Sequence, residues 1–207
     1  VDEREFERDL RRPILIFTVG RSGSSMVAGL LWVMGCWIGY TRYGDDWNPR
    51  GYFENTALKK LLKKTFGFEL LRPFPAASDG WRDAVAAELK AQGYRRGPWL
   101  FKTGVHYAGV WGEFDPIVVK VMRNRDQILE SYRRYGGIWH SLGDVAATEV
   151  IDRGLDRLAI LSGIEVDSEK LVAGNYSGIE KVCQRACLPF NARAVHDFII
   201  PGAFNGG

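Results

Sequence analysis

Apolar residues in this chain fall into short runs that alternate with longer segments of helical spacing. Short segments at 14–19, 99–102, 117–122 and 164–166 are predicted strands, and the first is continuously apolar, as is typical of a strand buried on both faces. Helical spacing and cap residues predict helices over 26–35, 54–66, 79–94, 125–135, 144–161 (one or two helices) and 177–186. Strands that alternate with helices indicate a parallel sheet with helices on both sides.

The length of the chain sets its expected organisation. A chain of 207 residues lies in the range of one domain and can bury a sizeable core. We therefore expect a single α/β domain over 1–207, a three-layer α/β/α arrangement with a parallel sheet of about four or five strands. The charged residues near the start predict a surface arm over 1–12. Residues 202–207 are expected to form a loose tail, and 37–53 a long connection at the substrate mouth.

Composition excludes several classes of protein. Seven Trp, eight Tyr and eleven Phe exclude a disordered chain. Three cysteines, an odd count, give no disulfide framework, and Cys183 and Cys187 lack the further ligands of a closed zinc site. No apolar run has the length of a membrane span, and we expect no signal peptide before the first strand. We therefore expect no metal, no membrane partner and a cytoplasmic protein.

The placement of the charges is more informative than their sum. The formal net charge of +3 is too balanced to indicate a nucleic-acid partner. Cations instead gather at predicted turns, a pattern that suits a small polyanionic ligand: Arg21, Arg50, Lys102, Arg123 and Arg125. Four lysines of the predicted helix over 54–66 are expected to form a solvated basic surface: Lys59, Lys60, Lys63 and Lys64.

A glycine-rich turn follows the first predicted strand. Its members are Gly20, Arg21, Ser22, Gly23, Ser24 and Ser25. Strand, turn and helix is the context in which backbone N–H groups and a helix N-terminus converge on an anion. Gly20 and Gly23 allow a sharp turn and a close approach of the ligand. The turn predicts a phosphate site, and the alternative is an ordinary turn with a serine cap.

This turn differs from the loop of nucleoside triphosphatases. That loop reads G-x-x-x-x-G-K-[ST], in which the lysine binds the outer phosphates and the hydroxyl binds magnesium. Here no lysine follows Gly23, and the cation is Arg21, inside the turn. Arginine carries a permanent charge and a planar fork of donors that needs no metal.

A second strand-to-helix junction carries Arg123 at the end of a predicted strand and Ser131 on the following helix. The first turn resembles the 5′-phosphosulfate loop of the sulfotransferases, and the Arg123 to Ser131 spacing matches the 3′-phosphate site of that family. The resemblance covers about residues 14 to 190 and departs from the family at Arg125, where relatives commonly have proline. Taken singly, Arg123 could instead pair with a carboxylate and Ser131 could lie on a helix surface.

The resemblance implies a P-loop-like fold and a donor, 3′-phosphoadenosine 5′-phosphosulfate (PAPS), bound by residues 20–25, Arg123 and Ser131 without a metal. It also implies sulfuryl transfer to a hydroxyl or amine of a small-molecule or carbohydrate acceptor. Arg21 is then the candidate for the donor's 5′-phosphate and sulfonyl group. Lys102 resembles the lysine of the Lys-Thr-His segment in cytosolic sulfotransferases.

The general base has two candidates. Gly104 stands where cytosolic sulfotransferases have their catalytic histidine, and His106 follows two residues later. The Gly-Tyr-Phe-Glu segment ending at Glu54 is similar to one in bacterial and carbohydrate-type sulfotransferases, in which a glutamate near this point deprotonates the acceptor. Glu54 is the leading candidate if partial burial brings its pKa toward the working pH, and its alternative role is to stabilise a helix start.

Two other functions stay open beside the sulfotransferase. The first is a phosphotransferase that uses ATP or GTP with magnesium, against which the absent lysine after Gly23 counts. The second is a catalytically silent nucleotide-binding module, which the displaced histidine keeps open. Five aromatic residues are candidates either for an acceptor pocket or for the core: Trp47, Tyr52, Tyr107, Trp111 and Trp139.

Overall fold

The computed structural model describes residues 2–46, 48–68, 79–135 and 143–199. Its strands are β1 (Ile14–Thr18), β2 (Leu100–Gly104), β3 (Ile117–Met122) and β4 (Ile164–Asp167). The α-helices are α1 (Glu3–Leu10), α2 (Ser24–Val33), α3 (Thr56–Phe66), α4 (Trp81–Ala91), α5 (Arg125–Tyr135), α6 (Gly143–Ile160), α7 (Ser168–Val172), α8 (Ser177–Arg185) and α9 (Ala192–Phe198). A 3₁₀ helix, η1 (Val105–Trp111), follows β2 directly.

Within the described residues, the strands form one parallel sheet of four strands in the order β2-β1-β3-β4. β1 pairs with β2 from Ile14 opposite Leu100 to Thr18 opposite Gly104, and with β3 along its other edge. The chain thus adds β2 on one side of β1 and β3 on the other. In parallel sheets this reversal opens a crevice at the carboxyl ends of the strands.

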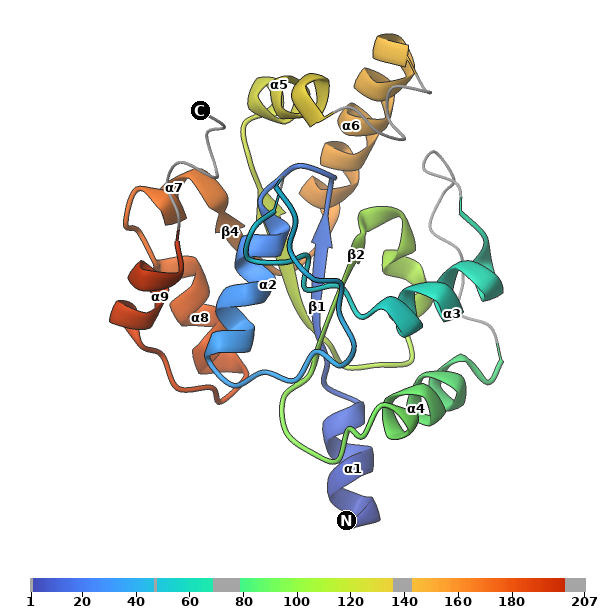
Figure 1. Cartoon of the computed structure of the whole chain (residues 1–207). Helices are drawn as coiled ribbons and strands as arrows, with labels where there is room; N and C mark the ends of the chain where they lie inside the picture. Colours follow the sequence, from blue (N-terminus) through green and yellow to red (C-terminus); the bar gives the residue numbers. More distant parts are fainter. Residues whose placement is uncertain (1, 47, 69–78, 136–142, 200–207) are drawn as a thin grey trace.

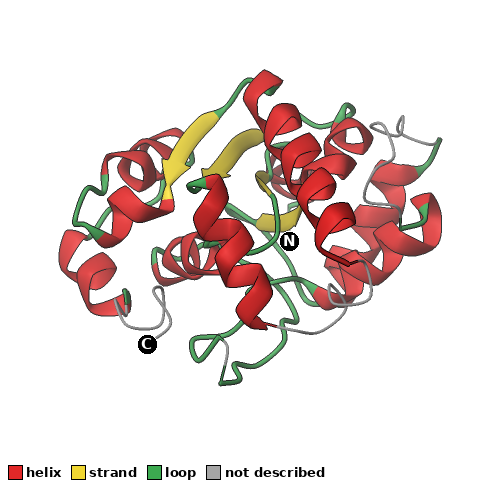
Figure 2. Ribbon diagram, turned by 90° about the horizontal axis from the view of Figure 1, so that it is seen from above, coloured by secondary structure: helices red, strands yellow, loops and turns green. Residues whose placement is uncertain are grey.

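Helices cover both faces of the sheet, as Figure 1 and Figure 2 show. On one face Leu15 and Phe17 of β1 pack into a core shared with α1, α3, α4, η1, α5 and α6. On the other face Ile14 and Ile16 pack with α2, α7, α8 and α9. All five residues of β1 are buried, as its continuously apolar sequence predicts. The predicted three-layer α/β/α fold and its strand number are confirmed.

The amino-terminal segment corrects the predicted surface arm. Residues 3–10 form α1, whose start is capped by the Asp2 side chain accepting from the Arg4 amide. Phe6 and Leu10 are 2% and 1% exposed, and the Phe6 ring lies 5.8 Å from that of Tyr94. Their spacing of four residues places both on one helix face, so the surrounding charges mark only the solvent side. The predicted tail at 202–207 lies outside the described residues.

Other element boundaries differ modestly from the predictions. The segment at 144–161 is one helix, α6, and α4 starts at Trp81, after Gly80 in a left-handed conformation, rather than at the predicted residue 79. η1, α7 and α9 were not predicted from the hydrophobic pattern, because each is only five to seven residues long. Cys183 is buried, whereas Cys187 is exposed. No helix in the described ranges is long and apolar enough to cross a bilayer.

Candidate functional site

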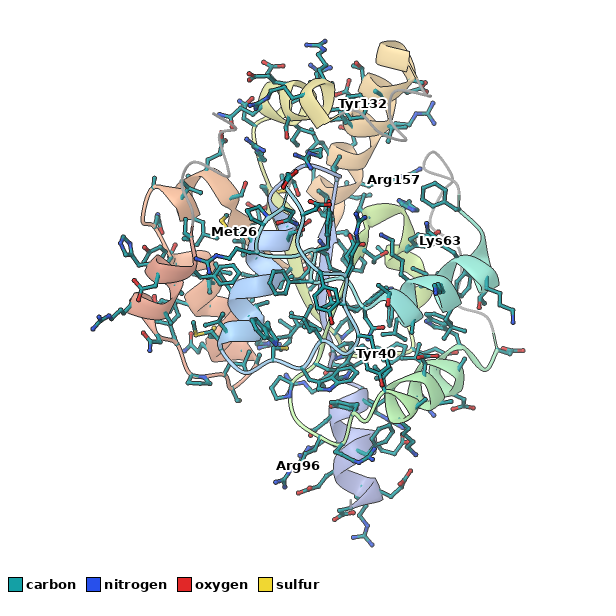
Figure 3. The ribbon with its side chains drawn as sticks, in the orientation of Figure 1. Met26, Tyr40, Lys63, Arg96, Tyr132 and Arg157 are labelled. Atoms are coloured by element: carbon teal, nitrogen blue, oxygen red, sulfur yellow. The ribbon has the colours of Figure 1, made fainter. Side chains whose placement is uncertain are left out.

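A cavity of about 500 Å³ lies where β1, β2 and β3 end. Met26 of α2, Lys63 of α3 and Arg157 of α6, labelled in Figure 3, contribute to its lining from three helices. The predicted site residues that line it are Gly20, Arg21, Gly23, Ser24, Ser25, Glu54, Lys102, His106, Arg123 and Ser131. Residues drawn from five distant parts of the sequence therefore meet in one cavity, at the crevice that the strand order creates.

The turn after β1 has an unusual backbone. Gly23 has φ +88° and Arg21 has φ +68°, both in the left-handed region. Glycine adopts this conformation freely, whereas an arginine there costs of order 1 kcal/mol, and such strain clusters at functional sites. α2 begins directly afterwards at Ser24, and no described side chain caps it. The first N–H groups of α2 and the positive end of its dipole therefore lie at the cavity.

Ser22 is the predicted turn residue whose side chain does not reach the cavity. It is 1% exposed, and its hydroxyl is hydrogen-bonded to that of Thr18. The Thr18 hydroxyl also donates to the Val19 carbonyl at 2.6 Å. Ser22 therefore links the turn to the end of β1 through a side-chain hydrogen bond.

Direct contacts join the two strand-to-helix junctions. Nη1 of Arg123 donates to the carbonyl of Arg21 at 3.0 Å, and Nε of Arg21 donates to Oγ of Ser131 at 3.1 Å. Nε and Nη2 of Arg123 both donate to Oε1 of Gln127 at 3.2 Å. These contacts hold the strained Arg21 backbone and fix both guanidinium groups beside the cavity.

Arg125, whose charge was expected to add to this cluster, is directed elsewhere. It forms a two-pronged ion pair with Asp152, with Nε–Oδ1 and Nη2–Oδ2 distances of 2.5 and 2.9 Å, and it is absent from the cavity lining. The structure therefore corrects the expectation that the five turn cations act together.

Lys102 lies at the end of β2 and is 4% exposed. Its Nζ donates to Oγ of Ser25 at 2.8 Å and to the carbonyl of Tyr52 at 2.7 Å, and lies 3.4 Å from Oε1 of Glu54. Burial lowers the pKa of Lys102 to about 8, although Glu54 opposes the shift. An ammonium group is thus held beside the first turn of α2 by three oxygens.

Glu54 is an ion-paired carboxylate. Its second oxygen, Oε2, pairs with Nζ of Lys59. Burial alone would raise the pKa of Glu54, but Lys102 and Lys59 outweigh it and hold the pKa below its ordinary value. The raised pKa expected for this residue is therefore not found. Glu54 is ionised at neutral pH and can accept a proton, though as a weaker base.

The alternative role of Glu54 at a helix start is wrong. α3 begins at Thr56, two residues later, and its cap is Asn55, whose side chain accepts from the Leu58 amide at 3.0 Å. Glu54 lies before the cap, on the connection between α2 and α3, whose Tyr52 carbonyl and Glu54 carboxylate contact Lys102.

His106 lies in η1 and is 9% exposed. Burial, with Arg157 and Lys63 nearby, lowers its pKa to about 4, and Nε2 has no hydrogen-bond partner among the described residues. A Cβ atom on Gly104 would lie 2.4 Å from Cε1 of His106, so the glycine makes room for the imidazole. A neutral imidazole with this pKa is a poor base near pH 7.

The structure divides the other aromatic candidates. Tyr52 and Tyr107 line the cavity, whereas Trp111 is 2% exposed in the core between the sheet and α4. Trp47 and Trp139 lie outside the described residues. No group of three or more His, Cys, Asp or Glu side chains in the described ranges is arranged to hold a metal ion.

Several lining residues were missed by the sequence reasoning. Lys59 and Lys63, assigned to a solvated surface, line the cavity, as do Arg42 and Arg157. The one sequence signal for Arg157 is the nearby glycine, Gly154. A Cβ atom at this position would lie only 2.7 Å from Cγ2 of Val19, so the absence of a side chain lets the two segments approach closely. This close approach brings α6 against the end of β1, and Arg157 follows almost one turn later on the same face.

No protein-family model matches the sequence, and a comparison with curated protein sequences gives no match. Among solved structures, the fold is similar to the crystal structure of a sulfotransferase from Mycobacterium tuberculosis, with a TM-score of 0.53 and 14% sequence identity. The match covers 95% of this chain and 73% of the other. At this identity the likeness establishes a sulfotransferase-like fold.

Proposed function

We propose that this chain is a sulfotransferase that moves a sulfuryl group from PAPS to a hydroxyl or amine of a small-molecule or carbohydrate acceptor. The observation that carries the proposal is the linkage of Arg21, Arg123 and Ser131. Two junctions separated by about a hundred residues of sequence converge through hydrogen bonds of 3.0 and 3.1 Å. Such convergence suits one ligand with two anionic groups, as PAPS has.

The donor has a natural orientation in this cavity. Its 3′-phosphate would bind Arg123 and Ser131 at the β3 side, because a guanidinium and a hydroxyl supply charge-assisted and neutral hydrogen bonds to phosphate oxygens. Its 5′-phosphosulfate would lie over residues 20–25, at the N-terminus of α2, where backbone N–H groups and the helix dipole favour an anion.

The transfer itself follows from this orientation. An acceptor oxygen attacks sulfur in line with the bridging oxygen; the new S–O bond forms as the bond to the 5′-phosphate breaks, and adenosine 3′,5′-bisphosphate leaves. Negative charge grows on the bridging and sulfonyl oxygens. Arg21 and Lys102 would stabilise that charge, because preorganised cations in a water-poor site act most strongly where charge develops.

The acceptor's proton would go to Glu54 rather than to His106. Glu54 is ionised beside Lys102, with Oε1 3.4 Å from its Nζ, so the base would lie next to the cation that stabilises the developing charge. Burial and two cations hold the pKa of His106 at about 4, which leaves it little basicity. We assign His106 to the wall of the acceptor side of the cavity.

Calorimetric titration of the purified chain tests the donor. We expect adenosine 3′,5′-bisphosphate to bind more tightly than adenosine 5′-monophosphate by on the order of 2–4 kcal/mol, and without magnesium. A ligand present at about 100 times its Kd should add roughly 2.7 kcal/mol of stability. Transfer of ³⁵S from labelled PAPS to an acceptor library should persist in excess chelator. Equal affinity for both nucleotides, or preference for ATP with magnesium, would overturn the proposal in favour of the phosphotransferase.

A further inference from the structure

The cavity carries far more positive than negative charge. Eight Lys and Arg side chains line it, against one carboxylate, Glu54, among the described lining residues. One of these cations, Arg42, is paired with Asp45 at 3.1 Å. PAPS carries about four negative charges near pH 7, counting two for the 3′-phosphate. Bound PAPS alone therefore does not neutralise all the positive charge of the cavity. A cleft lined by positive charge attracts negatively charged ligands.

Two of these cations lie away from the donor's predicted position. Lys63 belongs to α3 and Arg157 to α6, and both line the cavity (Figure 3). Both act electrostatically on His106, whose ring centre lies 6.3 Å from that of Phe68, and all four residues line the cavity. Lys63 Nζ also lies 4.4 Å from the ring centre of Phe68, another lining residue.

The strand order places this part of the cavity on the side of β1 opposite the proposed 3′-phosphate site. Arg123 and Ser131 follow β3, on one side of β1, whereas His106 follows β2 on the other side. Lys102 and Glu54, the groups that face the transferred sulfur in the proposed reaction, also lie on the β2 side. An acceptor that approaches Glu54 from the β2 side would pass Lys63, Arg157 and His106.

We propose that this subsite, formed by Lys63, Arg157 and His106, binds an acidic group of the acceptor, so that the substrates are anionic alcohols or phenols bearing a carboxylate or a similar oxyanion. The two cations pair with the oxyanion, and Phe68 and Tyr107 pack against the apolar body that carries it. This inference rests on the proposed function for the identity of the reaction, but the subsite itself is a statement about anion binding.

Matched pairs of acid and amide test the subsite. The probes are phenyl β-D-glucuronide with its amide and para-hydroxyphenylacetate with its amide, titrated calorimetrically into the chain with and without saturating adenosine 3′,5′-bisphosphate. We expect an acid to bind at least about tenfold more tightly than its amide in one or both pairs, as a charge-assisted contact warrants. Lys63→Glu should remove this preference and leave amide binding within about twofold.

Lys64→Glu is the control, because it makes the same change in net charge on an adjacent, exposed residue outside the cavity lining. Lys63 is itself exposed, so Lys63→Glu is expected to leave the fold intact. Equal binding of acids and amides, equal effects of the two glutamate variants, or no binding of either acid at millimolar concentration would each overturn the inference. Failure of adenosine 3′,5′-bisphosphate to bind would instead overturn the proposed function, whatever the acids do.

Discussion

The two sides of the cavity, on either side of β1, are held together by different interactions. On the β3 side, Arg123 and Arg21 donate to neutral oxygens: a carbonyl, the amide of Gln127 and the hydroxyl of Ser131. On the β2 side, Lys102 forms an ion pair with Glu54 as well as two hydrogen bonds. Arginine keeps its charge at every physiological pH, so the β3 side offers a constant charge to a ligand.

On the β2 side, by contrast, the shifted pKa values belong to groups that can gain or lose a proton between about pH 4 and pH 8. Burial lowers the pKa of Lys102 to about 8 and, with two nearby cations, that of His106 to about 4. Displaced pKa values of this kind cluster at functional sites. The comparison predicts that substitutions on the β3 side alter donor binding, whereas substitutions on the β2 side alter turnover and its pH dependence.

The largest expected effect is that of Glu54→Gln on turnover. The amide keeps the size of the side chain but cannot accept the acceptor's proton, so kcat should fall by roughly 10²–10⁴-fold. Affinity for adenosine 3′,5′-bisphosphate should change by less than about threefold, since the carboxylate lies on the other side of the cavity. Steady-state kinetics and calorimetry on the same preparation measure both.

Two further variants show which property of Glu54 matters. Lys59→Gln removes one ion pair of Glu54 and leaves the carboxylate, so turnover should fall by less than about tenfold. His106→Gln should retain most turnover. Loss of activity in the histidine variant, with activity kept in Glu54→Gln, would move the base to His106 and reverse the assignment.

The next largest effect is that of Arg123→Ala on donor binding. Removing its charge-assisted contacts should weaken adenosine 3′,5′-bisphosphate by on the order of 2–4 kcal/mol and adenosine 5′-monophosphate much less. Arg125→Ala is the matched control, because Arg125 follows two residues later and pairs with Asp152 outside the cavity lining. Comparable losses in the two variants would show that general charge, rather than a 3′-phosphate contact, determines affinity.

The pH dependence of turnover tests the role of Lys102 on the β2 side, and its expected effect is smaller than those above. Lys102 is protonated below its pKa of about 8 and loses its charge as pH rises through that value. If the ammonium stabilises the leaving phosphate, kcat/KM should fall about tenfold per pH unit above pH 8. In kcat the same fall should begin at higher pH, because a bound anionic donor raises the pKa of Lys102. Lys102→Arg should remove the limb. A flat profile to pH 9.5 in the unaltered enzyme would exclude this role for Lys102.

The sequence predicted best what local patterns determine. Continuous apolar runs identify β1 and β3. The glycine-rich turn after β1 and Arg123 after β3 identify the donor side of the cavity, because strand, turn and helix are contiguous in the chain. α1 shows the limit of this reasoning: its many charges conceal Phe6 and Leu10, whose burial depends on contacts with Tyr94 and other distant residues.

The acceptor side could be predicted only in part for the same reason. Lys63 and Lys64 are neighbours of one type, and nothing local distinguishes the one that lines the cavity from the one that does not. The pKa of Glu54 depends on Lys102, which lies far along the chain, so partial burial alone gave the wrong direction of shift. Long-range charge pairs have no signature in a single sequence.

The smallest expected effect measures the contact between Arg21 and Ser131, which joins the two junctions on the β3 side. Ser131→Ala should weaken adenosine 3′,5′-bisphosphate by about 1 kcal/mol, since a neutral donor is lost. Arg21→Lys should weaken it too, because an ammonium cannot reproduce the guanidinium fork. If the 3.1 Å bond from Arg21 Nε to Ser131 Oγ orients both groups, the double variant should lose less than the sum of the two, by at least 0.5 kcal/mol. Additivity to within about 0.3 kcal/mol would mean that the two residues contact the donor independently, and that the β3 side is two adjacent sites rather than one.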